Sequence, residues 1–233
     1  MKKSKDICDV KSCFLCKFCL KEWEQAIVGH KKNFKVKKGE VIFKEGDIVT
    51  GIFFVYEGNV KVHKKWGQEK ELILRIASKG AILGHRGLGK ELVYPVSATA
   101  LDSGIVCFID MDFFNATLKV NNEFTYQLMM FFAEELKESE RKMRDLAHMP
   151  VKGRVAQALL MLKQQFGITQ EGFLDIEMSR QDLASLTGAT YETLFRNIND
   201  LVQEGLISLH GKRILLRNEA GLADLTRPST SFL

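Results

Sequence analysis

Residues 179–217 restrict the possible fold of this chain more than any other segment. Ser179 is a suitable N-cap, because its side-chain oxygen can accept a hydrogen bond from an otherwise unpaired amide of the first helical turn. A short helix is therefore predicted to follow it and to end before Gly188, which supplies the backbone freedom that a sharp turn between two helices needs. Thr190 can cap a second helix, which we expect to extend to about Gln203.

The second helix is followed by the pattern of a short β-hairpin. Three apolar residues of the helix recur at a spacing of three or four, which assigns them to its buried face: Leu194, Ile198 and Leu201. Gly205 ends the helix, and the runs Leu206–Leu209 and Arg213–Leu216 can pair around His210-Gly211-Lys212. A helix presented in this way, with a two-stranded wing beside it, fits the major groove of B-DNA.

Motifs in both halves of the chain resemble those of one protein family. The sequence "SRQDLASLTGATYETLFRNINDLVQEGLISLHGKRILL" resembles the C-terminal winged helix of the Crp/Fnr superfamily of bacterial transcription regulators. The segments "KKGEVIFKEGD", "GIFFVYEGNVKV" and "GAILGHRGL" resemble the N-terminal β-roll of that superfamily. The resemblance covers about residues 20–220 in the right order, and it is closer to the Fnr-like branch than to the cyclic-AMP receptor branch.

This resemblance implies a fold and a set of partners. The fold is α+β, with an N-terminal double-stranded β-helix (jelly-roll) sensor domain, a long dimerisation helix and a C-terminal winged helix-turn-helix. The partners are double-stranded DNA with a palindromic site, a second copy of the chain in a homodimer, and RNA polymerase.

Local patterns divide the chain into five parts. Short β-rich runs interrupted by glycines fill residues 33–110 and are typical of a sandwich or jelly roll. From Asp112 the spacing of apolar residues becomes helical, and Met149-Pro150 breaks that pattern. The predicted parts are a Cys-rich N-terminal arm (1–21), a β-roll sensor domain (22–111), a dimerisation helix region (112–148), a winged helix-turn-helix DNA-binding domain (149–226) and a tail (227–233).

The helical pattern after Asp112 has an apolar stripe opposite a charged face. The stripe comprises Phe124, Leu128, Phe131 or Phe132, Leu136, Ser139, Met143 and Leu146. The charged face comprises Glu134, Glu135, Lys137, Glu138, Glu140, Arg141 and Lys142. In the resembled superfamily this helix is the dimer interface, so the stripe is expected to form a seam between two subunits. Packing of the stripe within one subunit is the alternative.

Net charge does not by itself indicate DNA binding. The chain carries a formal charge of +5, but residues 150–233 contain nine basic and nine acidic residues, so the excess lies outside the predicted DNA-binding domain. Local position is more informative. The residues expected to contact DNA are Arg180, Thr190, Tyr191, Glu192, Phe195, Arg196, Lys212 and Arg213. Among them, Glu192 and Arg196 are four residues apart and share a helix face, from which Arg can bond guanine and Glu can accept a hydrogen bond from cytosine.

The β-roll offers a candidate effector pocket, formed by Gly84, His85, Arg86 and Ser97. In the resembled superfamily a cyclic nucleotide is held by a Gly-Glu pair and by an Arg beside a small residue. Here His85 stands at the Glu position and Val96 at the Arg position. Because an apolar valine cannot neutralise a buried phosphate, a cyclic nucleotide is not favoured as the effector.

The cysteines indicate another input, a metal centre. Cys13, Cys16 and Cys19 have the spacing of three ligands of a ferredoxin-type cluster, whose fourth ligand is remote. Cys107 is the remote cysteine, and its segment "ALDSGIVCFI" looks like the one that supplies the distant ligand in the oxygen-sensing Fnr branch. We therefore expect an iron–sulfur cluster that responds to redox state, oxygen or nitric oxide. The alternatives are a zinc site that uses Cys8 in place of Cys107, and reduced thiols that bind no metal.

Other function classes find no support in the sequence. No apolar run reaches the ~18 residues that span a bilayer, and no signal-peptide core follows the charged N-terminus, so a cytoplasmic protein without a membrane partner is expected. Walker, nucleophile-elbow and His/Glu zinc motifs are missing, so an enzyme is not expected. Besides the metal-controlled regulator, two alternatives stay open: the same regulator sensing a small molecule in its β-roll pocket, and a β-roll regulatory module that does not bind DNA.

Overall fold

The structure, a computed structural model, describes residues 1–4, 13–67 and 70–228. It contains two compact units, Met1–Lys137 and Glu138–Leu233, and the division between them falls within the long helix α4 (Asn122–His148). In the described parts of the chain, no helix is both long enough and apolar enough to cross a membrane.

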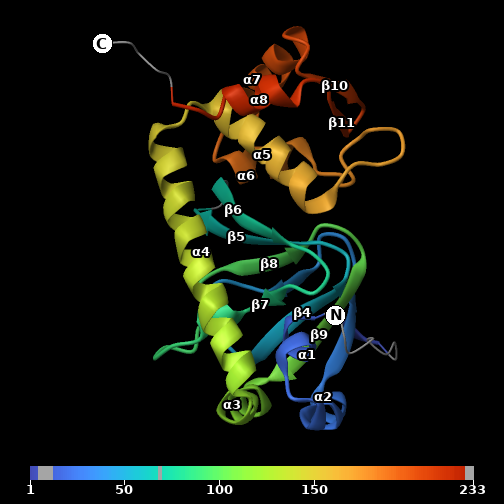
Figure 1. Cartoon of the computed structure of the whole chain (residues 1–233), viewed down its shortest axis with the longest axis vertical. Helices are drawn as coiled ribbons and strands as arrows, with labels where there is room; N and C mark the ends of the chain where they lie inside the picture. The colour runs from blue at the N-terminus through green and yellow to red at the C-terminus, as the bar shows by residue number, and fades with distance from the viewer. Residues whose placement is uncertain (5–12, 68–69, 229–233) are drawn as a thin grey trace. The chain divides into compact units, whose positions relative to one another are not determined.

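Antiparallel strands in two sheets form the β-roll of the first unit (Figure 1). The five-stranded sheet has the order β1-β2-β9-β4-β7, and the four-stranded sheet has the order β3-β8-β5-β6. The strands are β1 (Lys2–Lys3), β2 (Lys32–Val36), β3 (Val41–Phe43), β4 (Gly51–Glu57), β5 (Val60–Trp66), β6 (Lys70–Ala77), β7 (Ile82–Leu83), β8 (Ser97–Ala100) and β9 (Gly104–Asp110). The predicted jelly-roll class of fold is confirmed.

Strand β4 shows how both faces of the five-stranded sheet become buried. Phe53 and Val55 point into the core between the two sheets. Ile52 and Phe54 point to the opposite face, where they pack with helices. Because successive side chains of a strand alternate between faces, a continuous apolar run is what a strand with two buried faces requires. On the neighbouring β9, Cys107 lies on the face that the helices cover.

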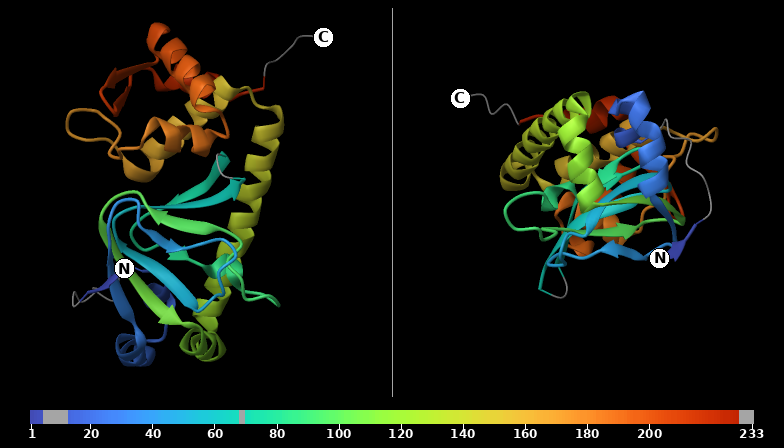
Figure 2. Two further views of the ribbon diagram at one scale, coloured as in Figure 1. Left: turned by 180° about the vertical axis from the view of Figure 1, so that it is seen from behind. Right: turned by 90° about the horizontal axis from the view of Figure 1, so that it is seen from below.

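Helices α2, α3 and the start of α4 cover the outer face of this sheet (Figure 2, right). Their fully buried side chains include Ile27 of α2, Phe114 of α3 and Phe124 of α4. The helical segments of the first unit that precede α4 are α1 (Phe14–Phe18), η1 (Lys21–Trp23), α2 (Glu24–His30), η2 (His85–Gly87) and α3 (Met111–Val120).

The helical pattern that begins at Asp112 forms two helices, α3 and α4, because Asn121 interrupts it. Asn121 is fully buried and has φ −109° and ψ 81°. Its side-chain oxygen accepts a hydrogen bond from the Leu20 amide at 2.9 Å, and its side-chain nitrogen donates to the Thr117 carbonyl oxygen at 3.0 Å. The break between α3 and α4 therefore depends on Leu20, which lies about a hundred residues earlier in the chain. Helical periodicity cannot show such a contact.

The apolar stripe predicted on α4 combines two faces of the helix. Phe124 and Leu128 are buried in the cluster on the outer face of the five-stranded sheet, so this part of the stripe packs within the subunit and is not available to a seam. A different line of apolar side chains is exposed: Tyr126 (52%), Met129 (58%), Leu136 (60%) and Met143 (62%). Of the predicted stripe, Leu136 and Met143 are therefore exposed, and the other exposed residues of this line, Tyr126 and Met129, were not predicted.

The second unit contains the predicted helix-turn-helix and wing (Figure 1). Its further elements are α5 (Val151–Phe166), α6 (Arg180–Thr187), α7 (Tyr191–Gln203), β10 (Ile207–His210), β11 (Arg213–Leu216) and α8 (Glu219–Asp224). Gly188 adopts the left-handed conformation, with φ 63° and ψ 36°, as the sharp turn requires. His210 pairs with Arg213 across the hairpin, so the turn between the strands is Gly211 and Lys212, one residue shorter than predicted.

Candidate DNA-binding surface and sensor sites

Both helices of the helix-turn-helix begin at the predicted caps. The Ser179 hydroxyl oxygen accepts a hydrogen bond from the Asp182 amide at 2.9 Å, and the Thr190 hydroxyl oxygen accepts one from the Thr193 amide at 3.2 Å. Inside α7, the side chains of Leu194, Ile198 and Leu201 are at most 1% exposed. These contacts fix which face of α7 is turned outward.

The outward face of α7 carries four of the predicted DNA contacts. Tyr191, Glu192, Phe195 and Arg196 are all exposed. Within the described residues, neither Glu192 nor Arg196 forms an ion pair or a side-chain hydrogen bond. Their donors and acceptors are therefore available to an external partner, as residues that contact base edges must be. Thr190 is exposed as well, but its hydroxyl group is engaged in the helix cap.

The basic residues predicted to contact DNA near the wing differ in whether their side chains already have partners within the chain. Arg180 donates from Nη2 to the Gly211 carbonyl oxygen at 3.3 Å, which connects α6 to the wing turn. Arg213 forms an ion pair with Glu171, and its guanidinium lies 3.9 Å from the centre of the Phe173 ring. Lys212 is exposed at the turn. Lys212 is thus accessible to an external phosphate group, whereas Arg213 connects the wing to the segment that carries Glu171 and Phe173.

In the first unit, the predicted effector residues His85 and Arg86 contact a carboxylate. The Glu135 side chain, from α4, accepts hydrogen bonds from Arg86 Nε at 3.0 Å and lies 3.1 Å from His85 Nε2. Its other oxygen lies 3.2 Å from Nε of Arg75, a residue of β6. His85 is 2% exposed and packs edge-on against the rings of Phe131 and Phe132. A carboxylate, two guanidiniums and an imidazole therefore meet against an aromatic wall; we call these four residues the Glu135 cluster.

The pKa values in the Glu135 cluster follow from burial and from the surrounding charges. Burial alone would raise the pKa of Glu135, but the hydrogen bond from His85 and the charges of Arg75 and Arg86 hold this pKa at about 2. Burial lowers the pKa of His85 and also that of Arg75. Near neutral pH the lowered pKa values therefore keep Glu135 as a carboxylate and His85 as a neutral imidazole.

Sequence reasoning missed Glu135 and Arg75. Glu135 was expected on the charged outer face of the helix, and the structure corrects this by placing it on the side that faces the β-roll. A signal was present, because Glu135 follows the buried Leu128 by seven residues and therefore shares its face. Arg75 interrupts the apolar run of β6, but nothing in that strand indicates a partner on α4.

The other two predicted effector residues have structural roles. Gly84 has φ 84°, and an added Cβ would lie 3.0 Å from the Tyr94 ring, so a side chain is disfavoured there. The Ser97 hydroxyl oxygen accepts a hydrogen bond from the Glu45 amide at 2.9 Å. Val96 is buried in the core between the two sheets. Of the predicted pocket, the structure thus joins His85 and Arg86 through Glu135, while Ser97 has a partner of its own.

Four of the predicted metal ligands belong to one buried cluster. Cys13 is the N-cap of α1 and Cys19 its C-cap, with the Cys13 sulfur accepting a hydrogen bond from the Cys16 amide at 3.3 Å. These three cysteines and Cys107 of β9 contribute to the apolar cluster on the outer face of the five-stranded sheet. Burial and the proximity of Cys13 raise the pKa of Cys19 to about 12. No three Cys, His, Asp or Glu side chains of the described chain are close enough to hold a metal ion, and Cys8 of the zinc alternative lies outside the described residues.

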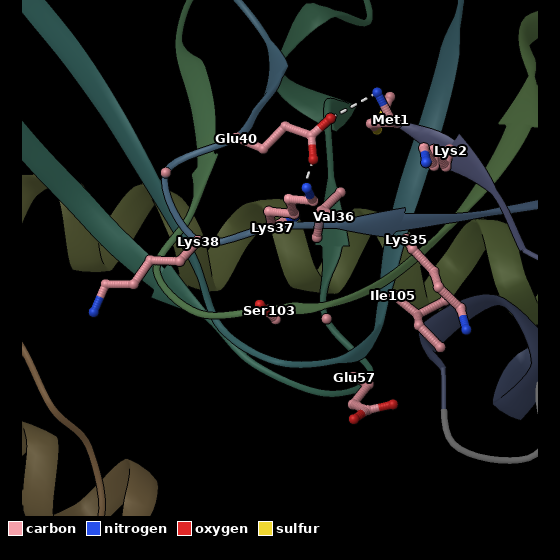
Figure 3. A pocket seen from close by; sticks show the side chains of 12 residues that line it. Met1, Lys2, Lys35, Val36, Lys37, Lys38, Glu40, Glu57, Ser103 and Ile105 are labelled. Atoms are coloured by element: carbon pink, nitrogen blue, oxygen red, sulfur yellow. Dashed lines mark hydrogen bonds and ion pairs between the residues drawn. The ribbon is translucent and has the colours of Figure 1, made fainter.

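A surface hollow of about 890 Å³ lies elsewhere on the β-roll (Figure 3). Its lining includes residues 1–2, 35–40 and 103–105, so it is not the predicted effector pocket. The Glu40 carboxylate accepts a hydrogen bond from the Lys37 amide at 2.9 Å and pairs with the Met1 amino group at 2.7 Å. The side chains of Lys35 and Lys38 point away from Glu40 (Figure 3), so the lysines do not converge on a shared point.

Two protein families match separate parts of the chain. Residues 33–121 match the cyclic nucleotide-binding domain family, and residues 153–225 match the Crp-like helix-turn-helix domain family. The second match favours a DNA-binding regulator over a regulatory module that does not bind DNA.

Individual relatives agree as well. The anaerobic regulatory protein of Bacillus subtilis is 30% identical over 190 residues, which are 79% of this chain and 80% of that protein. The cAMP-activated global transcriptional regulator CRP of Salmonella typhimurium is 30% identical over 200 residues, or 84% and 92% of the two chains. The fold matches that of FixK2 from Bradyrhizobium japonicum, with a TM-score of 0.75 at 24% identity over 85% of this chain and 98% of that one. The chain therefore belongs to the Crp/Fnr superfamily of DNA-binding transcription regulators.

Proposed function

We propose that this regulator binds a palindromic DNA site as a homodimer, with one α7 helix in each half-site, under the control of a signal received by its cysteine arm. The observation that carries the proposal is the outward face of α7, where Glu192 and Arg196 are exposed and unpaired within the described residues. Arg196 can form two hydrogen bonds with a guanine, and Glu192 can accept one from a cytosine amino group. Both residues match superfamily positions that contact half-sites with a TGA-like core, and RNA polymerase is the expected protein partner.

The exposed line on α4 supports the homodimer. Met129, Leu136 and Met143 are each more than half exposed and are seven residues apart. Apolar residues at this spacing form one seam along a helix, and two such seams can pack together in a coiled coil. A closed two-fold dimer would present two α7 helices to the two halves of a palindrome.

Substitution of Leu136 by glutamate is expected to weaken both the dimer and its binding to a palindrome. A charge placed in the seam opposes its burial, and a monomer loses the gain in affinity that two linked half-sites provide. Sedimentation and gel shift with a palindromic duplex measure the two effects. Ile48→Glu is the matched control, because Ile48 is 74% exposed but lies outside α4. A Leu136→Glu variant that stays fully dimeric at micromolar concentration would contradict this interface.

For the signal, the four cysteines match an iron–sulfur group in the number and kind of their donors, but the described chain holds no three of them close enough to bind a metal ion, so the arm would have to move for the group to bind. The three-residue spacing places Cys13, Cys16 and Cys19 around α1, and Cys107 adds a fourth thiol in the same buried cluster. Four thiolates are the usual ligands of such a cluster, which when bound would supply reactivity with oxygen and nitric oxide. Within the chain, Cys107 would tie the arm to β9, while the aromatic residues packed around the thiols would exclude water.

Protein purified without oxygen from iron-replete cells is expected to absorb visible light and to lose this absorption in air. Cys107→Ser should abolish the absorption, because it removes the remote ligand, whereas Cys8→Ser should leave most of it. Absorption spectra and metal analysis of the two variants provide the measurement. Zinc binding predicts a colourless protein and the opposite ranking of the variants. Colourless protein without metal would contradict both metal centres.

A small molecule that binds the β-roll is the second candidate signal. It would reach the Glu135 cluster, where two guanidiniums pair with one carboxylate. The Salmonella typhimurium relative is named as cAMP-activated. A cyclic nucleotide is still not favoured here, because the Glu135 carboxylate would repel its phosphate and already engages both arginines.

A further inference from the structure

Tyr191 and Phe195 form an exposed aromatic pair at the start of α7. Their ring centres are 6.5 Å apart and their ring planes differ by 11°. The two residues are 48% and 52% exposed, so they contribute little to the core that Leu194 and Ile198 form on the other face. Two neighbouring rings left in water forgo the free energy of burial, and exposed apolar surface of this kind marks a site of interaction.

The aromatic pair lies beside the pair of polar residues proposed to contact bases. Tyr191 and Phe195 precede Glu192 and Arg196 by one residue each, which is a rotation of about 100° around the helix axis. The two pairs therefore form parallel stripes at the same depth along α7.

The chemistry of the major groove limits what an aromatic stripe can recognise there. Base edges present hydrogen-bond donors and acceptors, and the apolar group among them is the C5-methyl group of thymine. The Phe195 ring has no polar atom, so it cannot satisfy a donor or an acceptor, whereas it can cover a methyl group. Tyr191 lies beside it, with its ring nearly parallel to that of Phe195.

We propose that Phe195, supported by Tyr191, is a specificity-determining residue that recognises the C5-methyl group of a thymine next to the bases contacted by Glu192 and Arg196. This inference rests on the proposed role of α7 as the helix that contacts bases. It adds an A·T pair, with a defined strand orientation, to the half-site that the polar residues recognise.

The test uses the full chain and a duplex that it selects from a random pool. Each thymine of one half-site is replaced in turn by deoxyuridine, which removes the methyl group and keeps every hydrogen-bonding atom. Binding is expected to weaken about three- to five-fold at one or two positions, as expected for one methyl group covered by apolar surface. At those positions, 5-methylcytosine paired with guanine should bind better than cytosine paired with guanine.

Variants separate the methyl contact from other effects. Phe195→Ala should remove the difference between thymine and deoxyuridine, and Phe195→Leu should keep part of it. Val202→Ala is the matched control, because Val202 is a 37% exposed apolar residue of the C-terminal half of α7, and it should leave the difference unchanged. Circular dichroism shows whether each variant is folded.

Three results would overturn the inference, and they are distinguishable. If the wild-type chain binds the selected duplex specifically but every thymine can become deoxyuridine without loss, the methyl contact is refuted while the proposed function stands. If the difference persists in folded Phe195→Ala, another residue makes the contact. If the chain selects no duplex, the proposed role of α7 fails together with this inference.

Discussion

Replacement of Glu135 by glutamine is expected to lower the free energy of unfolding of the first unit by about 3 kcal/mol at pH 7. Glutamine keeps the size of the side chain but removes the negative charge that Arg75 and Arg86 share. The partly buried Arg75 would then lack this counter-ion and His85 would lose its carboxylate partner. Urea unfolding followed by tryptophan fluorescence measures the change, because Trp23 and Trp66 both lie in the first unit.

Glu134→Gln is the matched control for this prediction. The Glu134 side chain is 64% exposed and pairs with Lys137 at the surface, so its loss should change stability by no more than about 0.5 kcal/mol. Equal losses in the two variants would show that the Glu135 cluster does not stabilise the fold.

The stabilisation by Glu135 should also depend on pH. Its pKa falls from 4.5 to about 2 on folding, so the folded state releases this proton more readily than the unfolded state does. The contribution is therefore fully present above pH 4.5 and is lost as the pH falls toward 2. The difference between wild type and Glu135→Gln should shrink to about half its neutral value by pH 3. A difference that stays constant over this range would contradict the lowered pKa.

Arg196→Ala is expected to lose about 1–3 kcal/mol of specific DNA binding, or about five- to 150-fold in affinity, and to relax the preference at one G·C pair. The side chain is exposed on α7, so its loss should not affect folding. Gel shifts with the selected duplex and with scrambled DNA measure specific and non-specific affinity separately.

Arg227→Ala controls for the loss of a positive charge. Arg227 is exposed and pairs with Asp224 near the end of the described chain, away from α6, α7 and the wing in sequence. It should change affinity for both duplexes slightly and equally. If wild type and Arg196→Ala both bind the selected and the scrambled duplex with equal affinity, the assignment of Arg196 to a base is wrong.

Elements whose signals are local could be predicted from the sequence. The start of α6 after Ser179, the left-handed Gly188 and the bounds of α7 all follow from residues within one or two turns of each other. The break predicted at Met149-Pro150 likewise coincides with the start of α5, whose N-cap is Pro150. Caps and turns act through neighbouring backbone groups, so the sequence contains the necessary information.

Features that depend on distant partners could not be predicted in this way. Two apolar stripes run along α4, and periodicity does not show that the β-roll covers the one with Phe124 and leaves the one with Met129 exposed. The spacing from Leu128 can indicate the face on which Glu135 lies, but not that β6 brings Arg75 to it. Arg213 was assigned to DNA by its place in the wing, but its contacts with Glu171 depend on how a preceding loop folds.

Asn121, the residue between α3 and α4, connects the end of the cysteine arm to the start of α4 by a hydrogen bond. The Leu20 amide, one residue after Cys19, is held by the Asn121 side chain, and Trp23 Nε1 donates to Thr117 Oγ1 at 3.0 Å. Separating these groups would leave buried polar atoms unpaired at a cost of about 1–3 kcal/mol each. We therefore expect a displacement of Cys19 to reach the start of α4 through these two hydrogen bonds. Coupling of this kind would require no rearrangement of the β-roll sheets.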